Sequence, residues 1–238
     1  MKSLYESLVI EEWDPESYGG AAQGAGFYVQ ADHKDGYTAG GELDIKIQGQ
    51  KITIKEKKSL GDKVHRVHFD IEKPGTYNFD IQADCDISLY IYSERAVKGI
   101  SIATSGKPIA NFFMDCKKCQ FVNLSKADIC YFDFDGQTKL QELTGPTAKE
   151  CGFRIAKCPN LESVDLSGIV STPTNDGVSR LYIRNCRKLS LIRPPQAVGM
   201  DVNLEKLPAL SAAAAKVIAD VATKSGYKCY DFDKQRSA

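Results

Sequence analysis

The cysteines of this chain are its first candidates for chemistry, because two of them are spaced like zinc ligands. Cys116 and Cys119 enclose two lysines, and a Cys-x-x-Cys pair commonly supplies half of a tetrahedral zinc site. The sequence has no second pair at matching spacing, so the other ligands would have to be the isolated Cys130, Cys151 or Cys158. Free cysteine also packs as a small hydrophobic residue. We therefore predict buried thiols that form no disulfide, and we predict no metal or other cofactor.

Histidines and aspartates are the next candidates, for acid–base catalysis or for binding calcium. The histidines are His33, His65 and His68. A histidine-based triad needs an activated serine or cysteine beside the histidine, and the sequence contains no nucleophile-elbow motif. The aspartates that could bind calcium are Asp84, Asp86, Asp133 and Asp135, and they do not form an EF-hand pattern. We therefore predict no catalytic residue, no metal site and a protein that is not an enzyme.

The composition limits the classes of partner. The 238 residues include 31 basic and 31 acidic ones, so the formal net charge is zero. Nucleic-acid-binding proteins usually carry a basic excess that neutralises phosphates, and we predict no nucleic-acid partner. No apolar run is long enough to cross a bilayer, and the first residues lack the apolar stretch of a secretory signal. We expect no membrane association and a cytoplasmic location, or a place in the virion if the protein is viral.

The N-terminal region is predicted to form an arm followed by hairpins. Residues 1–41 are expected to be an arm, because their many glycines favour irregular backbone. Residues 42–85 alternate apolar and polar side chains, as strands do. Pro74-Gly75 lies between two such runs and suits a type II turn. This pattern predicts two antiparallel hairpins, the second of which spans residues 67–81.

Residues 86–200 repeat a short apolar pattern. The clearest copies are Phe153–Leu166 and Leu181–Ile192, each with two alternating apolar residues followed by a cysteine and a leucine. The residues at the cysteine position are Glu94, Cys116, Gln137, Cys158 and Cys186, separated by 22, 21, 21 and 28 residues. A nearly constant interval is typical of repeat architectures. One unit cannot bury its apolar side alone, so neighbouring units must stack.

The pattern apolar-x-apolar-x-x-Cys-x-x-Leu resembles the leucine-rich repeat, in particular its irregular, cysteine-bearing forms. The resemblance covers about residues 86–200 and implies one short strand per unit with two inward apolar side chains. Several units lack the leucine expected three residues before the strand, so we expect a short, flat β-solenoid. We further expect a buried column of Cys116, Cys158 and Cys186, and a continuous core that contains Ile155, Leu161, Val164, Ile183 and Leu189.

A helix is predicted to close the C-terminal end. Ser211 is a good N-cap, the residues after it are mostly helix formers, and Gly226 suits the position after the helix. Residues 201–238 are therefore expected to form a cap, with a helix at about 211–225 and a final strand. The predicted fold is mainly β: an arm, a β-hairpin region, a β-solenoid similar to leucine-rich repeats, and a capping helix.

The resemblance also implies a surface, because the residues between and just after the inward pair of a leucine-rich repeat face outward. The outward residues would be Tyr90, Tyr92, Phe112, Met114, Asp133, Asp135, Arg154, Ala156, Tyr182 and Arg184. This row is a candidate binding surface, since aromatic residues and arginine dominate binding hot spots. Alternatively, its aromatic members pack under the N-terminal arm, because large exposed apolar patches are uncommon on monomers.

These expectations favour a non-enzymatic protein that binds protein partners or builds an assembly through its repeat surface, for example as a component of a virion. Two alternatives remain open. Residues 67–81, with their Pro-Gly turn and Tyr77, look like strands of sugar-binding β-sandwiches, which favours a carbohydrate-binding module. Asp133 and Asp135 could instead be the acidic residues of an enzyme, because parallel β-solenoids can carry such residues.

Overall fold

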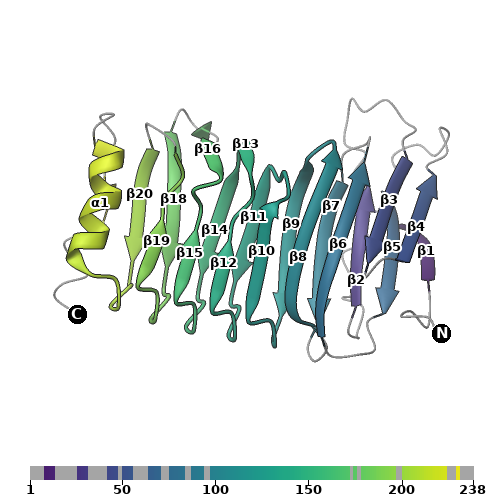
Figure 1. Ribbon diagram of the computed structural model, residues 1–238, viewed down its shortest axis with the longest axis horizontal. Helices are drawn as coiled ribbons and strands as arrows, with labels where there is room; N and C mark the ends of the chain where they lie inside the picture. Colours follow the sequence, from purple (N-terminus) through teal and green to yellow (C-terminus); the bar gives the residue numbers. More distant parts are fainter. Residues whose placement is uncertain are drawn as a thin grey trace.

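The computed structural model shows a mainly β chain whose strands stack side by side along one long axis (Figure 1). It describes the backbone of residues 8–13, 26–31, 42–47, 50–55, 64–70, 75–83, 87–93, 97–171, 174–175, 178–196, 200–223 and 229–230. Side chains are described for residues 75–82, 88–91, 97–170, 182–196 and 203–218. From residue 87 the chain winds as a β-solenoid, and a helix follows it at the C-terminal end. The predicted fold class is confirmed.

One long sheet, called sheet A here, runs along the stack. From β7 to β20 its neighbouring strands are parallel and in register, so that Phe132 lies opposite Phe153, and Ile155 opposite Ile183. Its strands, in spatial order, are β1 (Leu8–Trp13), β5 (Val64–Asp70), β2 (Gly26–Ala31), β7 (Ile87–Ser93), β9 (Ile109–Cys116), β11 (Tyr131–Asp135), β14 (Gly152–Ala156), β18 (Val178–Arg184), β20 (Met200–Glu205) and β21 (Cys229–Tyr230), with the short β17 (Thr174–Asn175) beside β18.

A second sheet, called sheet B, lies across the core from sheet A. Its strands, in spatial order, are β19 (Leu191–Arg193), β15 (Ser163–Asp165), β12 (Glu142–Thr144), β10 (Phe121–Lys126), β8 (Val97–Gly106), β6 (Gly75–Ala83), β3 (Glu42–Ile47) and β4 (Gln50–Lys55). Each coil from β7 to β19 therefore places one strand in sheet A and the strand that follows it in sheet B. The short strands β13 (Ala148–Glu150) and β16 (Ile169–Ser171) pair with each other on a third side.

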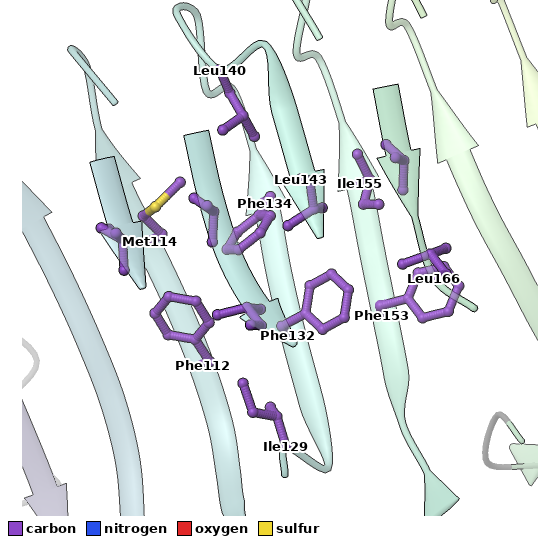
Figure 2. Packing of buried hydrophobic residues seen from close by; sticks show 14 of the residues in the cluster. Phe112, Met114, Ile129, Phe132, Phe134, Leu140, Leu143, Phe153, Ile155 and Leu166 are labelled. Atoms are coloured by element: carbon purple, nitrogen blue, oxygen red, sulfur yellow. The ribbon is translucent and has the colours of Figure 1, made fainter. Parts of the chain in front are cut away.

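The hydrophobic core fills the space between the two sheets, because successive side chains of a strand point to opposite sides. Figure 2 shows the inward phenylalanines of successive coils. The rings of Phe132 and Phe153 stack with centroids 5.4 Å apart, and Phe112 meets Phe134 edge-on at 5.5 Å. The predicted core residues Ile155, Leu161, Val164, Ile183 and Leu189 are at most 1% exposed. The predicted core is confirmed.

The N-terminal strands close the stack differently from the prediction. β3 and β4 form the first expected hairpin. The second expected hairpin is wrong, because β5 pairs with β1 and β2 in sheet A, whereas β6 pairs with β3 and β8 in sheet B. β5 and β6 thus follow each other as the two strands of a coil do. Pro-Gly between two strands is compatible with either connection, so the turn residues alone did not distinguish them.

Two strands of sheet A come from residues 1–41, which the sequence analysis assigned to an arm. β1 pairs with β5, and β2 lies between β5 and β7, antiparallel to both. Sheet B is extended in the same way by the antiparallel strands β3 and β4. The parallel stack therefore ends in antiparallel strands in both sheets.

At the other end, parallel pairing continues past residue 200. β20 pairs in register with β18, and Leu204 on β20 and Leu207 just after it are buried, so residues 200–210 form a further coil. The helix α1 (Ala212–Thr223) follows, and Ser211 Oγ accepts a hydrogen bond from the Ala214 backbone N–H at 3.1 Å, which confirms the predicted N-cap. In the described part of the chain, no helix is long and apolar enough to cross a membrane.

Candidate binding surface

The outward side of sheet A carries one in-register row of side chains from β7 to β20. We call this the outer row, and its members are Tyr90, Phe113, Asp133, Arg154, Tyr182 and Asn203. Tyr90 lies opposite Phe113, Phe113 opposite Asp133, and Asp133 opposite Arg154. Since Ile155 lies opposite Ile183, Arg154 and Tyr182 share the row as well, and Tyr182 lies opposite Asn203. All six side chains are partly exposed.

Six of the predicted surface residues with described side chains lie on this side, and three do not. Asp133, Asp135, Arg154, Tyr182 and Arg184 are partly exposed, as is Tyr90 at the N-terminal end. Phe112 and Met114 are instead core residues, 0% and 5% exposed, and Ala156 is buried too. The side chain of Tyr92 lies outside the described residues. On β9 the outward residues are Phe113 and Asp115, which the sequence analysis missed.

The shifted register of β9 has a cause in the turn that follows it. In the later coils a residue with positive φ stands between the strand and the cysteine position; these residues are Gly136, Lys157, Asn185 and Lys206, with φ of 75°, 52°, 56° and 55°. On β9, Asp115 is followed directly by Cys116. Aligning the coils on their cysteines therefore moved the β9 side chains by one residue, which exchanges the two sides of a strand. Phe112, Phe113 and Met114 are three successive apolar residues, so alternation alone did not reveal the register of β9.

Aromatic side chains occupy the N-terminal half of the surface. The rings of Tyr90 and Phe113 stack with centroids 4.9 Å apart and an interplanar angle of 17°. Phe113 also contacts Tyr131, with centroids 6.1 Å apart. Burial, followed by the charge of Asp133, raises the pKa of the Tyr131 hydroxyl. Three neighbouring coils thus present one continuous aromatic patch.

Charged side chains occupy the middle of the surface. Arg154 donates to Asp133 at 3.2 Å and to Asp135 at 2.5 Å, and Lys157 lies 3.4 Å from Asp135. Although burial disfavours its charged form, the carboxylates of Asp133 and Asp135 raise the pKa of Arg154. Both carboxylates are therefore engaged by cations.

Tyr182 and Arg184 occupy the C-terminal half of the surface, where the Arg184 guanidinium lies 5.3 Å from the centre of the Tyr182 ring. Three buried side-chain atoms of the described residues have no hydrogen-bond partner: Asp133 Oδ1, Arg184 Nε and Asn203 Oδ1. All three residues belong to β11, β18 or β20 and to this side of sheet A. Buried polar atoms are nearly always paired, and these three exceptions lie together on one side of sheet A.

The predicted cysteine column lies behind the surface, in the core. Cys116, Cys158 and Cys186 are fully buried, and Gln137 occupies the position between the first two. Cys158 Sγ donates to the backbone oxygen of Ala156 at 3.2 Å. The hydrogen bond with Cys186, together with burial, raises the pKa of the Cys158 thiol. The predicted burial is confirmed, and the absence of metal stays a prediction that elemental analysis of the purified protein can check.

We expect Cys130 to be alkylated much faster than the other described cysteines. Cys130 is exposed, whereas the buried ones are Cys116, Cys119, Cys151, Cys158 and Cys186. Burial raises the pKa of Cys119 to about 12, and only the thiolate reacts, so iodoacetamide at neutral pH should label it slower than Cys130 by about two orders of magnitude. Mass spectrometry of time points measures this. Equal labelling of Cys119 in the folded protein would contradict its burial.

The other predicted chemical groups are placed as follows. His33 lies outside the described residues, and His65 and His68 lie on β5, where only the backbone is described. Among the described side chains, no three histidine, cysteine, aspartate or glutamate residues are grouped so as to hold a metal ion. No protein-family model matches the chain, and neither curated proteins nor solved structures show a significant match to it.

Proposed function

We propose that this protein is a non-enzymatic interaction or assembly protein, which binds a protein partner through the outward side of sheet A. The observation that carries the proposal is the concentration of unpaired polar atoms and partly exposed aromatic and arginine side chains on that side. Membership of a large assembly such as a virion is part of the same proposal.

The rigidity of the surface supports this proposal. Each member of the outer row is held on a strand that is hydrogen-bonded to both neighbours, at a strand spacing of about 4.8 Å. Aromatic side chains on such a frame lose little conformational entropy when a partner binds. Aromatic residues and arginine are also the types that supply most of the binding energy in protein interfaces.

The two alternatives have less support. The carbohydrate-binding alternative used residues 67–81 as a hairpin, and β5 and β6 lie in different sheets. The enzyme alternative used Asp133 and Asp135 as acidic catalysts, and Arg154 pairs with both of them. The interaction proposal needs neither feature.

We expect Tyr182→Ala and Arg184→Ala each to weaken binding of the native protein partner by more than about 1 kcal/mol, or about fivefold in Kd. Both side chains lie on the outward side of sheet A, and each substitution removes a large contact. The partner is identified by purification of the native protein with its bound proteins, and isothermal titration then gives Kd for each folded variant.

The matched controls lie on sheet B, where Arg193 and Leu191 are exposed on β19. Arg193→Ala and Leu191→Ala should change the affinity by less than about twofold, because typical surface contacts contribute little. Changes at Lys55, Lys57 and Lys58 should also have little effect. If the control changes abolish binding while Tyr182→Ala and Arg184→Ala leave it intact, the partner binds elsewhere.

A further inference from the structure

We propose that the outer row pairs with the outer row of a second copy of this chain, around a twofold axis that runs parallel to the strands between β11 and β14. The inference rests on the proposed function, because it names the partner of the same surface. A twofold interface requires a self-complementary surface, in which residue i of one copy meets residue j of the second copy and j meets i. The outer row has this property.

The order of residues along the stack provides the complementarity. The axis exchanges β11 with β14, β9 with β18, and β7 with β20. It brings Asp133 opposite Arg154 of the second copy, Phe113 opposite Tyr182, and Tyr90 opposite Asn203. Opposite charges thus meet beside the axis, and aromatic rings meet on either side of it.

The neighbouring row follows the same order. It carries Asp115 on β9, Asp135 on β11, Ala156 on β14 and Arg184 on β18, so the axis brings Asp115 opposite Arg184 of the second copy and Asp135 opposite Ala156. The carboxylates of these two rows lie on β9 and β11, and their arginines lie on β14 and β18. Glu205 on β20 departs from this order, and Lys206 lies 3.5 Å from it as a neutralising partner.

The unpaired atoms match the same arrangement. Asp133 Oδ1 is an acceptor and faces the donors of Arg154 in the second copy. Arg184 Nε is a donor and faces the carboxylate of Asp115 in the second copy. Asn203 Oδ1 is an acceptor and faces the hydroxyl of Tyr90 in the second copy. Side-chain rotamer changes on association are common and would bring these atoms together. All three unpaired atoms of the described residues therefore face a group of complementary chemistry.

The other twofold arrangement is disfavoured. An axis along the stack would leave each strand opposite its own copy, so the acidic strands β9 and β11 would face acidic strands, and β14 and β18 would face basic ones. Placing like charges together is unfavourable and excludes wrong arrangements. The charge order thus selects the axis that runs parallel to the strands.

The area of the surface indicates a weak dimer. Six strands at about 4.8 Å and the three rows of side chains that contain Tyr131, Asp133 and Asp135 cover an area that would bury on the order of 1,000 Å² in total, at the lower end of specific interfaces. Packed sheets are also rotated by about 30° relative to each other. The pairs closest to the axis, Asp133 with Arg154, stay in contact at any such angle and are therefore the pairs to test.

The experiment uses complementary charge reversals in the full chain. Arg154→Glu and Asp133→Arg should each raise the dimer Kd at least about tenfold, because each places like charges across the axis. An equimolar mixture of the two variants should form a heterodimer with a Kd within about threefold of the native value, since both cross-axis pairs are restored in it. Sedimentation velocity over a concentration series measures the dimer Kd of each variant and of the mixture. Native mass spectrometry of the mixture detects the heterodimer.

Controls separate pairing from folding. Asp165 and Arg193 form a similar ion pair between neighbouring strands of sheet B, with N and O atoms 3.1 Å apart, so Arg193→Glu and Asp165→Arg should not change the dimer Kd. If Arg154→Glu does not fold, judged by circular dichroism, Arg184→Glu with Asp115→Arg tests the next pair.

Two results would overturn the inference: a native protein that stays monomeric throughout the series, or a variant mixture that dimerises no better than either variant alone. The proposed function is tested separately. If the native protein is monomeric but Tyr182→Ala still weakens binding of another protein, self-pairing is wrong and the proposed function stands. If neither is observed, both are wrong.

Discussion

Leu161→Ala is expected to lower the free energy of unfolding by about 2–5 kcal/mol. Leu161 is fully buried, in the turn between β14 and β15, and its N–H donates to the Cys158 oxygen at 3.2 Å. Cys119, Leu140 and Leu189 are buried after the corresponding turns of other coils, so the coils on either side hold the site open. A cavity that cannot collapse costs the most. Urea denaturation of the purified variant, followed by circular dichroism, measures the change.

Leu191→Ala is the control for this measurement, because Leu191 is half exposed on β19. Its loss should change the free energy of unfolding by less than about 0.5 kcal/mol, as surface substitutions usually do. A Leu161→Ala variant as stable as the Leu191→Ala variant would show that the assigned coil packing is incorrect.

Gln137→Leu is expected to lower the free energy of unfolding by about 2–6 kcal/mol, although leucine is more hydrophobic. The buried amide of Gln137 accepts from the Cys116 backbone N–H at 3.0 Å and donates to the Met114 backbone oxygen at 2.6 Å. In the later coils the residue with positive φ donates its N–H to a backbone oxygen of the next coil, as Lys157 does to Arg184 at 3.1 Å. β9 lacks that residue, so Gln137 supplies the acceptor. Leucine would leave two buried backbone groups unpaired, at about 1–3 kcal/mol each.

Gln141→Leu is the matched control, because Gln141 is an exposed glutamine in the same coil. It should leave the urea midpoint almost unchanged. Equal midpoints for the native protein and Gln137→Leu would mean that Cys116 N–H and Met114 oxygen have other partners.

The sequence predicted the solenoid core well because burial repeats with the coil. Ile155, Leu161 and Ile183 stand at positions where only apolar side chains fit, so their spacing alone located the core. The helix at α1 was also predictable, because Ser211 caps it through a local hydrogen bond.

Other features depended on pairing between distant segments, which short patterns do not report. β2 lies between β5 and β7 in sheet A, and no pattern in residues 26–31 indicates that these strands are its neighbours. The register of β9 depended on one missing residue before Cys116. The last coil was missed because Leu207 stands at the cysteine position, 21 residues after Cys186.

The in-register stacking of coils has a consequence for how such a chain can change its length. Each coil contacts only its neighbours, so single coils can be gained by duplication or lost by deletion. The unit here is 21 residues, as between Gln137 and Cys158. The described outer row spans six strands, an even number, so the proposed axis falls between two strands. One added coil would make the number odd, and the central residue would then face its own copy. A charge there would repel itself, so such chains are expected to evolve by pairs of coils, or to place a neutral side chain at the centre.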